Sequence, residues 1–307
     1  MSGTSRATQV IAVIALVLFW SLNWPMMKAG LSTVEPWTFR ALLVLCGGVG
    51  SLSVALMGGQ SIRIPREDWS MLLALSFFQG CLWNAFSGFG IAMIDAGRAS
   101  VLAFTMPVWA TVLSIYFLGE RVSRKRLVGL FFGLMGIALL LAPAFVRVSQ
   151  EVFGSLLMVA GAMSWGAATV VFKAAGWRAK VLAVTGWHFL IGGIPLFIAA
   201  FAIGEPSTLM AIRGQTAVAV LYSATIPMVL CQFIWFRIVE RIPANLASMG
   251  TLFVPVLGVF FSALILGESI GALEIAALIL VFLAMLLILP GISLQATLRR
   301  PQSSRPG

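Results

Sequence analysis

Aromatic and neutral polar side chains stand near the middle of several long apolar runs, where they can contact a ligand. Indole and phenol rings offer stacking faces and cation–π contacts, while side-chain amides donate and accept hydrogen bonds. Inside a bilayer such polar groups are costly, so each marks either a contact between helices or a path for a substrate. The candidate substrate-binding residues are Trp20, Asn23, Gln79, Trp83, Asn84, Trp109, Trp165, Tyr222 and Gln232.

This residue set suits a small substrate that carries hydrogen-bonding groups on a partly apolar body. An alternative applies to each residue, because the indoles can fill a bundle core and the amides can bond across helices. Trp20 and Trp165 favour the binding interpretation, since they hold equivalent places in the two repeats described below.

Four basic side chains near the ends of the apolar runs can guide an anion. Lys28 and Arg40 fall on one side of the predicted membrane, and Lys173 and His188 occupy the equivalent positions on the other. A cation on each side of the membrane can attract a substrate carboxylate to the transport path or release it from the path. The alternatives are that the long side chains reach for the membrane interface and that His188 bonds between helices instead of carrying protons.

Acidic residues and cofactor motifs are missing from the apolar runs. All ten acidic residues fall in predicted loops or near the ends of predicted spans, so no buried carboxylate offers a proton or sodium site. The chain has one histidine and no C-x-x-C, G-x-S-x-G or Walker A pattern. We therefore expect no metal site, no organic cofactor and no enzymatic activity.

The composition indicates which elements must hold these side chains. Hydrophobic residues make up 60% of the chain and charged residues 10%, and the mean hydropathy is +1.03. A spanning helix needs about 20 mostly apolar residues, and runs of this size fill most of the sequence. The predicted fold class is an all-α membrane protein with ten transmembrane helices, at 8–29, 36–57, 69–93, 99–118, 126–143, 152–174, 181–203, 213–238, 245–266 and 271–290.

The basic charge balance follows from a membrane topology. A net charge of +10 would suggest a nucleic-acid partner in a soluble protein, but here the basic residues are divided unevenly between alternate loops. If the N-terminus is cytoplasmic, fifteen Lys and Arg residues face inward and five face outward. The positive-inside rule then places both termini in the cytoplasm. We expect the lipid bilayer as a partner and no nucleic acid.

The chain contains one pattern twice. Near the end of each copy the recurring residues are displaced by 148 positions. Ala99-Ser100 recurs as Ala247-Ser248, Pro107 as Pro255, and Gly119-Glu120 as Gly267-Glu268. Earlier in the copies, Trp20 falls on Trp165 and Lys28 on Lys173, displaced by 145. The predicted units are 8–143 and 152–290, followed by a disordered cytoplasmic tail at 291–307.

Five predicted spans in each copy turn the second copy upside down relative to the first, because five is odd. Such an inverted repeat lets a transporter alternate between outward-open and inward-open shapes around a central site. A duplicated scaffold or a channel is the alternative. Pro107 and Pro255 hold equivalent positions within their spans, where they can be symmetric hinges or simply tolerated kinks.

These motifs resemble the drug/metabolite transporter superfamily, specifically its EamA-like families. The resemblance rests on the proline followed by Gly-Glu at the end of the same span in each copy, and on the first-span pattern Phe19-Trp20-Ser21-Leu22-Asn23. It covers residues 8–290 and implies a basket of ten helices around a central cavity lined mainly by spans 1, 3, 4, 6, 8 and 9. Ala167-Ala168 stand where the first copy has Leu22-Asn23, so the site cannot be chemically symmetric.

The resemblance also implies a function. The length and the aromatic interior look most like bacterial exporters of aromatic and other amino acids. We therefore expect an inner-membrane exporter of amino acids or similar small metabolites that works as a monomer. Drug or nucleotide-sugar transport is the nearest alternative, and a membrane enzyme or a receptor is a more distant one.

Overall fold

The computed structural model describes residues 6–118, 123–142, 150–232, 234 and 253–288 of the 307-residue chain. Within these ranges the secondary structure is helical and contains no strand. Seven of its helices or helical runs are long and apolar enough to cross a membrane, and two further apolar helices are shorter. The all-helical class and its membrane-spanning character agree with the prediction.

The helices follow the predicted segments in order. The first half of the chain forms α1 (Arg6–Leu31), α2 (Pro36–Met57), α3 (Trp69–Leu75), η2 (Ser76–Leu82), α4 (Trp83–Met93), α5 (Ala96–Ala103), α6 (Met106–Leu118) and α7 (Arg124–Leu141). The second half forms α8 (Gln150–Ala174), α9 (Val181–Ala202), α10 (Gly214–Thr225), η5 (Ile226–Cys231), α13 (Phe253–Leu266) and α14 (Ala272–Ile288). Short 3-10 turns are η1 (Arg66–Asp68) and η4 (Pro206–Ala211). The repeat residues Gly119-Glu120 and Ala247-Ser248 and the predicted tail lie outside the described residues.

Three of the predicted spans are not uniform α-helices. The third passes from α3 through the π-helical η2 into α4, and the eighth passes from α10 into the π-helical η5. The fourth is broken at Phe104 and Thr105, directly before Pro107. Pro107 and Pro255 each occupy the first turn of a helix, α6 and α13, where the missing N–H removes no helical hydrogen bond. Their hinge role stays a prediction.

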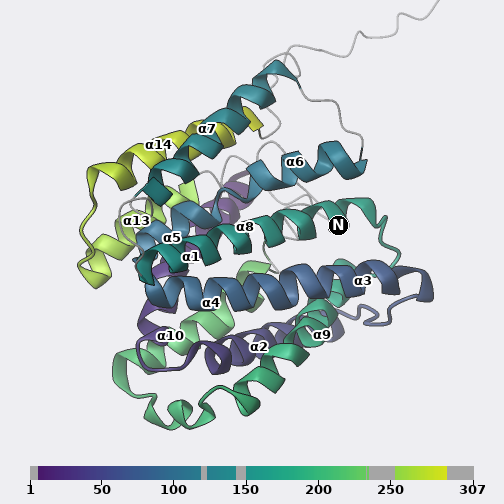
Figure 1. The fold of residues 1–307 in the computed structure, drawn as a ribbon. Coiled ribbons are helices and arrows are strands. Elements are labelled where there is room, and N and C mark those ends of the chain that lie inside the picture. The colour runs from purple at the N-terminus through teal and green to yellow at the C-terminus, as the bar shows by residue number, and fades with distance from the viewer. Residues whose placement is uncertain (1–5, 119–122, 143–149, 233, 235–252, 289–307) are drawn as a thin grey trace, which may run out of the picture.

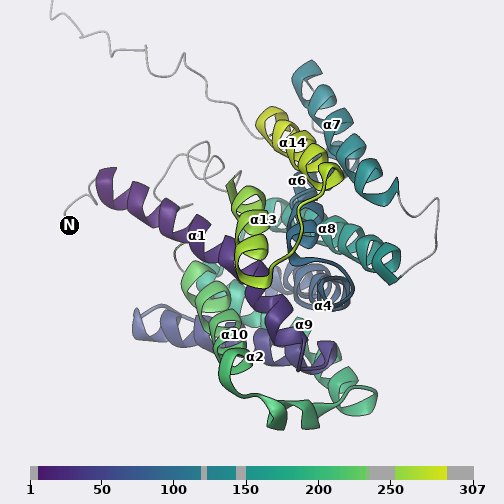
Figure 2. The same cartoon turned by 90° about the vertical axis from the view of Figure 1, so that its left-hand side faces the viewer.

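Contacts between the two halves of the chain build the bundle. α2 packs along α9, and α7 packs along α14. In Figure 1 these two pairs lie at opposite edges of the bundle, and the turned view in Figure 2 shows the same arrangement. α1 packs against α10 and α13 of the second half, while α8 packs against α4 and α6 of the first half. The core is therefore shared between the halves.

The crossing of α9 with η2 brings two glycines together. A Cβ added to Gly192 of α9 would lie 2.5 Å from the Cα of Gly80 in η2, and it would also overlap the carbonyl oxygen of Ser76. Small residues at such a crossing let two backbones approach closely, as in other membrane helix pairs.

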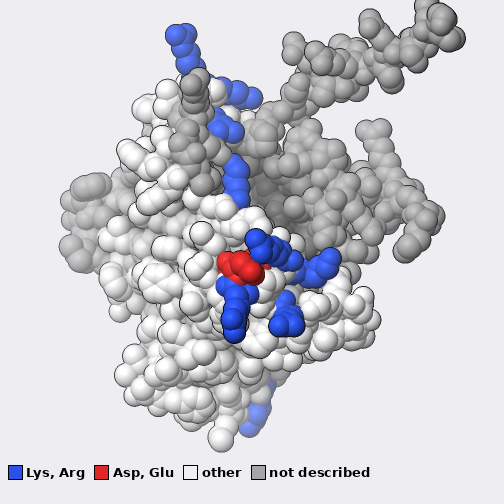
Figure 3. All heavy atoms as spheres, turned by 90° about the vertical axis from the view of Figure 1, so that its right-hand side faces the viewer, with Lys and Arg blue, Asp and Glu red and all other residues white. Residues whose placement is uncertain are grey.

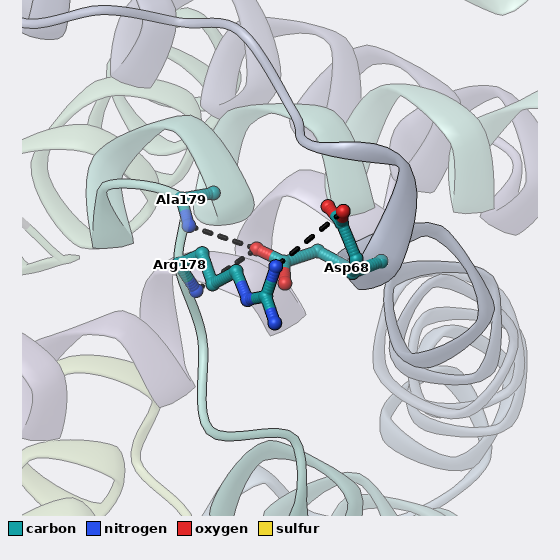
Figure 4. Close-up of polar contacts among 4 residues, drawn as sticks. Asp68, Arg178 and Ala179 are labelled. Carbon is teal, nitrogen blue, oxygen red and sulfur yellow. Dashed lines mark hydrogen bonds and ion pairs between the residues drawn. The ribbon is translucent and has the colours of Figure 1, made fainter.

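A buried carboxylate ties the start of the third predicted span to the loop before α9. Asp68 is 4% exposed, and its Oδ2 accepts hydrogen bonds from the backbone N–H groups of Arg178 at 3.1 Å and Ala179 at 2.8 Å (Figure 4). The neighbouring Glu67 pairs with the Arg178 guanidinium at 3.4 Å, but both side chains are exposed, so this pair contributes little.

On one face of the molecule, acidic side chains lie among several Lys and Arg side chains (Figure 3). Arg66 and Lys180 belong to this end of the bundle by their place in the chain, next to the bonded segments. Basic residues gathered at one end agree with the charge asymmetry of the sequence, and the orientation in the membrane stays a prediction.

At the opposite end of the same span, one cap closes the end of α4 and a second cap closes the start of the following helix, α5. The Lys28 ammonium group donates hydrogen bonds to the carbonyl oxygens of Ile91, Ala92 and Ile94 at 3.0, 3.0 and 2.8 Å, at the C-terminus of α4. A cation is favourable there because the C-terminal carbonyls of a helix carry partial negative charge. All three donors of the ammonium group are used in this cap.

Glu268 forms the matching cap at the start of α5. It follows Gly267, whose φ of 69° reverses the chain after α13, and its carboxylate accepts from the N–H groups of Ala96 at 2.7 Å and Gly97 at 2.9 Å. A carboxylate at a helix N-terminus satisfies free donors and complements the helix dipole. The second half of the chain thereby fixes a helix of the first half.

We expect Glu268→Gln to lower the free energy of unfolding by about 1 kcal/mol, because the amide retains one acceptor and loses the charge. Thermal unfolding of the purified protein in detergent measures the change. Glu205→Gln is the control, since Glu205 is exposed and its described hydrogen bonds are accepted by its backbone carbonyl. An equal drop for both variants would contradict the cap assignment.

Candidate substrate-binding cavity

A small cavity lies at the meeting point of helices from both halves of the chain. Its volume is about 80 Å³, and it is lined by Trp20, Asn23, Trp24, Met27, Arg40, Leu43, Gln79, Trp83, Asn84, Phe104, Trp165, Phe189, Pro227, Met228, Gln232 and Val254. Ligand pockets usually measure about 300–1,000 Å³. Side chains must therefore move apart before this cavity admits an amino acid.

A larger hollow, of about 540 Å³, lies at the end of α2 beside Trp69 and Trp187. It contains none of the residues that the sequence singles out for binding. We place the candidate site in the smaller cavity, because aromatic rings, amides and a charged group converge there.

Most of the predicted substrate-binding residues come together in this cavity. Those that line it are Trp20, Asn23, Gln79, Trp83, Asn84, Trp165 and Gln232. Two others do not line it. The Tyr222 hydroxyl donates to the carbonyl oxygen of Phe19 at 2.8 Å and joins α10 to α1. Trp109 lies on α6, where its Cβ is close to Gly166 of α8. Whether the lining residues bind a substrate stays a prediction.

The four basic candidates occupy different surroundings. Arg40 lines the cavity, whereas Lys28 caps α4 and the exposed Lys173 lies in the last turn of α8. His188 is buried on α9 and does not line the cavity; its Nδ1 lies 3.2 Å from the carbonyl oxygen of Val184. Of the four, Arg40 is the residue that the fold presents to the cavity.

Two indole rings form an aromatic wall. The ring centroids of Trp83 on α4 and Trp165 on α8 are 4.7 Å apart, with the ring planes inclined by 51°. Trp20 and Trp24 on α1 contribute two further indoles to the lining. Aromatic pairs at this separation stabilise each other, and their free faces can stack on an apolar or aromatic group.

The π-helical segment η2 supplies Gln79 to the lining, and its backbone carbonyls bind neighbouring side chains. A π turn disturbs the regular backbone ladder, and two side chains bond to the carbonyls of η2. Asn84 Nδ2 donates to the carbonyl oxygens of Gln79 and Gly80 at 3.0 Å each, and Ser164 Oγ donates to that of Phe78 at 2.7 Å. π turns occur frequently at functional sites, and η5 provides Pro227 and Met228 to the same cavity.

Polar and aromatic residues near the middle of the apolar runs predict only part of the site, and they do not identify the other residues that line the cavity. Trp24 and Met27 could have been found, because Trp20, Asn23, Trp24 and Met27 follow the spacing i, i+3, i+4, i+7 of one helix face. Leu43 likewise stands three residues after Arg40. Phe104 reaches the cavity from the break before Pro107, and this break cannot be located from hydropathy.

Apolar helices around a cavity of indoles, amides and one arginine define a multi-pass membrane protein with an internal cavity. The chain belongs to the EamA-like transporter family, whose pattern matches residues 7–142 and 152–289. This agrees with the resemblance noted in the sequence. Members of the family are transporters and not enzymes, so the chain is a membrane transporter whose substrate is a small molecule.

Similar proteins occur in several bacteria. The transporter YoaV of Bacillus subtilis is 28% identical over 262 residues, which are 85% of this chain and 89% of that protein. A probable amino-acid metabolite efflux pump of Escherichia coli is 25% identical over 288 residues, covering 90% of this chain and 93% of the pump. Its counterpart in Salmonella typhimurium is 24% identical and covers 96% and 99%.

A solved crystal structure has the same fold. It superimposes with a TM-score of 0.65 at 21% sequence identity and covers 92% of this chain and 96% of its own. At this identity the likeness concerns the fold alone.

Proposed function

We propose that the protein is a secondary transporter that exports amino acids, with aromatic and other neutral ones favoured, or similar small metabolites, across the inner membrane by alternating access. The cavity carries this proposal, because both halves of the chain supply its indoles and amides. Stacking faces and neutral hydrogen-bonding groups suit a compact molecule with an apolar side chain. Two of the relatives are named as probable amino-acid metabolite efflux pumps.

The proposal includes ten spans in two inverted five-helix units, forming a basket around the cavity. The packing of α1 against α10 and α13 has a counterpart in the packing of α8 against α4 and α6. The π-helical η2 and η5 also lie in equivalent spans of the two units. Such correspondence supports a pseudo-two-fold axis through the shared cavity.

A second pair of contacts supports the same axis. Asp68 contacts the backbone of Arg178, and Thr33 Oγ1 lies 3.1 Å from Thr216 Oγ1. Thr216 stands 148 residues after Asp68, and Arg178 stands 145 residues after Thr33, which are the two displacements of the sequence repeat. Equivalent loops are thus joined at both ends of the bundle, through a carboxylate in one case and hydroxyls in the other.

Both termini are proposed to be cytoplasmic. In a background without native cysteines, we expect a single cysteine at Arg147 to react with a membrane-impermeant maleimide added outside whole cells. A cysteine at Arg124 should react only after the membrane is opened, because the inner loops hold most of the basic residues. Reversed accessibility of the two positions would contradict the orientation.

Transport by the purified protein in liposomes tests the function. We expect labelled phenylalanine to enter protein-containing vesicles down its concentration gradient without a pH or sodium gradient, because the described residues that line the cavity include no acidic residue. Vesicles with protein that was unfolded before reconstitution are the control. Equal uptake in both vesicle types, over a panel of labelled amino acids, would contradict the proposal.

A further inference from the structure

Arg40 is a buried charge without a partner in the described part of the protein. Its side chain lines the cavity, the residue is 3% exposed, and its Nε and Nη2 atoms have no hydrogen-bond partner. An arginine guanidinium stays protonated in proteins. Leaving such a charge buried and unpaired is strongly unfavourable, so an anion is required to complete the site.

No carboxylate of the described lining supplies that anion. Glu35 lies just before α2, the helix that carries Arg40, but its side chain is already used at the start of that helix. Its two carboxylate oxygens accept from the N–H groups of Trp37 at 2.8 Å and Thr38 at 3.0 Å. The sixteen residues that line the cavity include no Asp or Glu. Among the described residues and the ligand, this leaves the ligand as the source of the anion.

The packing of α4 makes room for this arginine. A Cβ added to Gly88 would lie 2.9 Å from Arg40 Cγ and 3.3 Å from Arg40 Nε. The aliphatic stem of Arg40 thus lies directly on the backbone of α4, and a larger residue at position 88 would push it away. The contact between α2 and α4 therefore positions the guanidinium group.

The cavity offers a neutral acceptor in addition to the cation. Asn23 Oδ1 is buried and has no hydrogen-bond partner in the described part of the chain, and Asn23 lines the same cavity as Arg40. An amide oxygen can accept a hydrogen bond from an ammonium group or from a hydroxyl group. The protein therefore presents a full charge to an anionic group and only a neutral acceptor to a neighbouring donor.

We propose that Arg40 binds the carboxylate of the substrate, and that the substrate class is monocarboxylates with an apolar side chain, whether the second group is an ammonium or a hydroxyl. Guanidinium groups bind carboxylates through two parallel hydrogen bonds. Asn23 accepts from the group on the α-carbon, and the side chain lies against Trp83 and Trp165. This inference rests on the proposed transport function and narrows its substrate.

Three ligands that share a phenyl ring test the inference with the wild-type protein. Binding to purified protein in detergent is measured by titration calorimetry with phenylalanine, 3-phenyllactate and phenethylamine. We expect similar dissociation constants for the two carboxylates and binding of phenethylamine weaker by about 30-fold or more. The amine has no group for Arg40 and brings a second positive charge beside it. Equal binding of phenethylamine would overturn the inference.

Substitution of Arg40 gives a second test. Arg40→Gln should weaken both carboxylates by about 30-fold or more, whereas Arg40→Lys, which keeps the charge without the planar fork, should weaken them less. Arg98→Gln is the matched control, because Arg98 lies in α5 and does not line the cavity. Unchanged carboxylate binding in folded Arg40→Gln would overturn the inference, and the wild-type panel decides if that variant does not fold.

The liposome assay separates this inference from the proposed function. Carboxylate binding that depends on Arg40, without flux of any ligand, would contradict transport and support the carboxylate site. Flux of phenylalanine that is unchanged by Arg40→Gln would support transport and overturn the role of Arg40.

Discussion

Gly192→Ala is expected to lower the free energy of unfolding by about 3 kcal/mol or more. The added methyl group would lie 2.5 Å from the Cα of Gly80, and it would also meet the carbonyl oxygen of Ser76. Both obstacles are backbone atoms, which cannot rotate away as a side chain does. α9 and η2 must therefore separate, and the yield and thermal stability of the purified protein report the loss.

Gly136→Ala in α7 is the matched control. There the nearest atom to an added Cβ is Cγ2 of Val281, at 3.1 Å, and a side chain can adjust at small cost. A similar loss of stability in both variants would mean that adding a methyl group to any packed helix destabilises the protein, and that the close backbone contact of α9 with η2 is not the cause.

Trp165→Ala should reduce transport of phenylalanine by about fivefold while changing transport of alanine much less. Ring stacking contributes about 1 kcal/mol, and a large side chain loses that contact when the indole is removed. Trp83, whose ring centroid lies 4.7 Å from that of Trp165, also loses its partner. Initial uptake rates of both amino acids into liposomes, from the same preparation, give the ratio.

Trp69→Ala is the control for this experiment, because Trp69 is 42% exposed and lies outside the cavity. It should leave the phenylalanine-to-alanine ratio unchanged. A constant ratio in folded Trp165→Ala would assign Trp165 to packing and would place the substrate side chain elsewhere.

The positions of the helices were predictable from the sequence because apolar length is a strong signal. The second predicted span, 36–57, coincides with α2, and the predicted starts and ends of the other described helices are close to those observed. The interruptions were not predictable in the same way. A π turn such as η2 depends on contacts from Asn84 and Ser164, and Ser164 belongs to a helix from the other half of the chain.

The candidate site was partly predictable for a similar reason. Polar groups in apolar spans have to face the interior, so Asn23 and Gln232 were natural candidates, and both line the cavity. Hydropathy does not give the direction in which a ring points, and Tyr222 bonds to the backbone of α1 instead. The partners of Lys28 are backbone carbonyls of α4, and only the tertiary fold places them within reach.

The unpaired charge of Arg40 also affects how the membrane potential acts on the transporter during alternating access. With an empty cavity, any displacement of α2 across the bilayer moves a net positive charge through the membrane potential, at about 2.3 kcal/mol per 100 mV for a full crossing. With a bound hydroxy acid such as 3-phenyllactate, the pair is neutral and the potential exerts no such force, whereas a zwitterionic amino acid leaves the net positive charge in place. The protein loaded with a hydroxy-acid anion therefore reorients more freely than the empty one, and for such anions this difference favours exchange of one for another over one-way release.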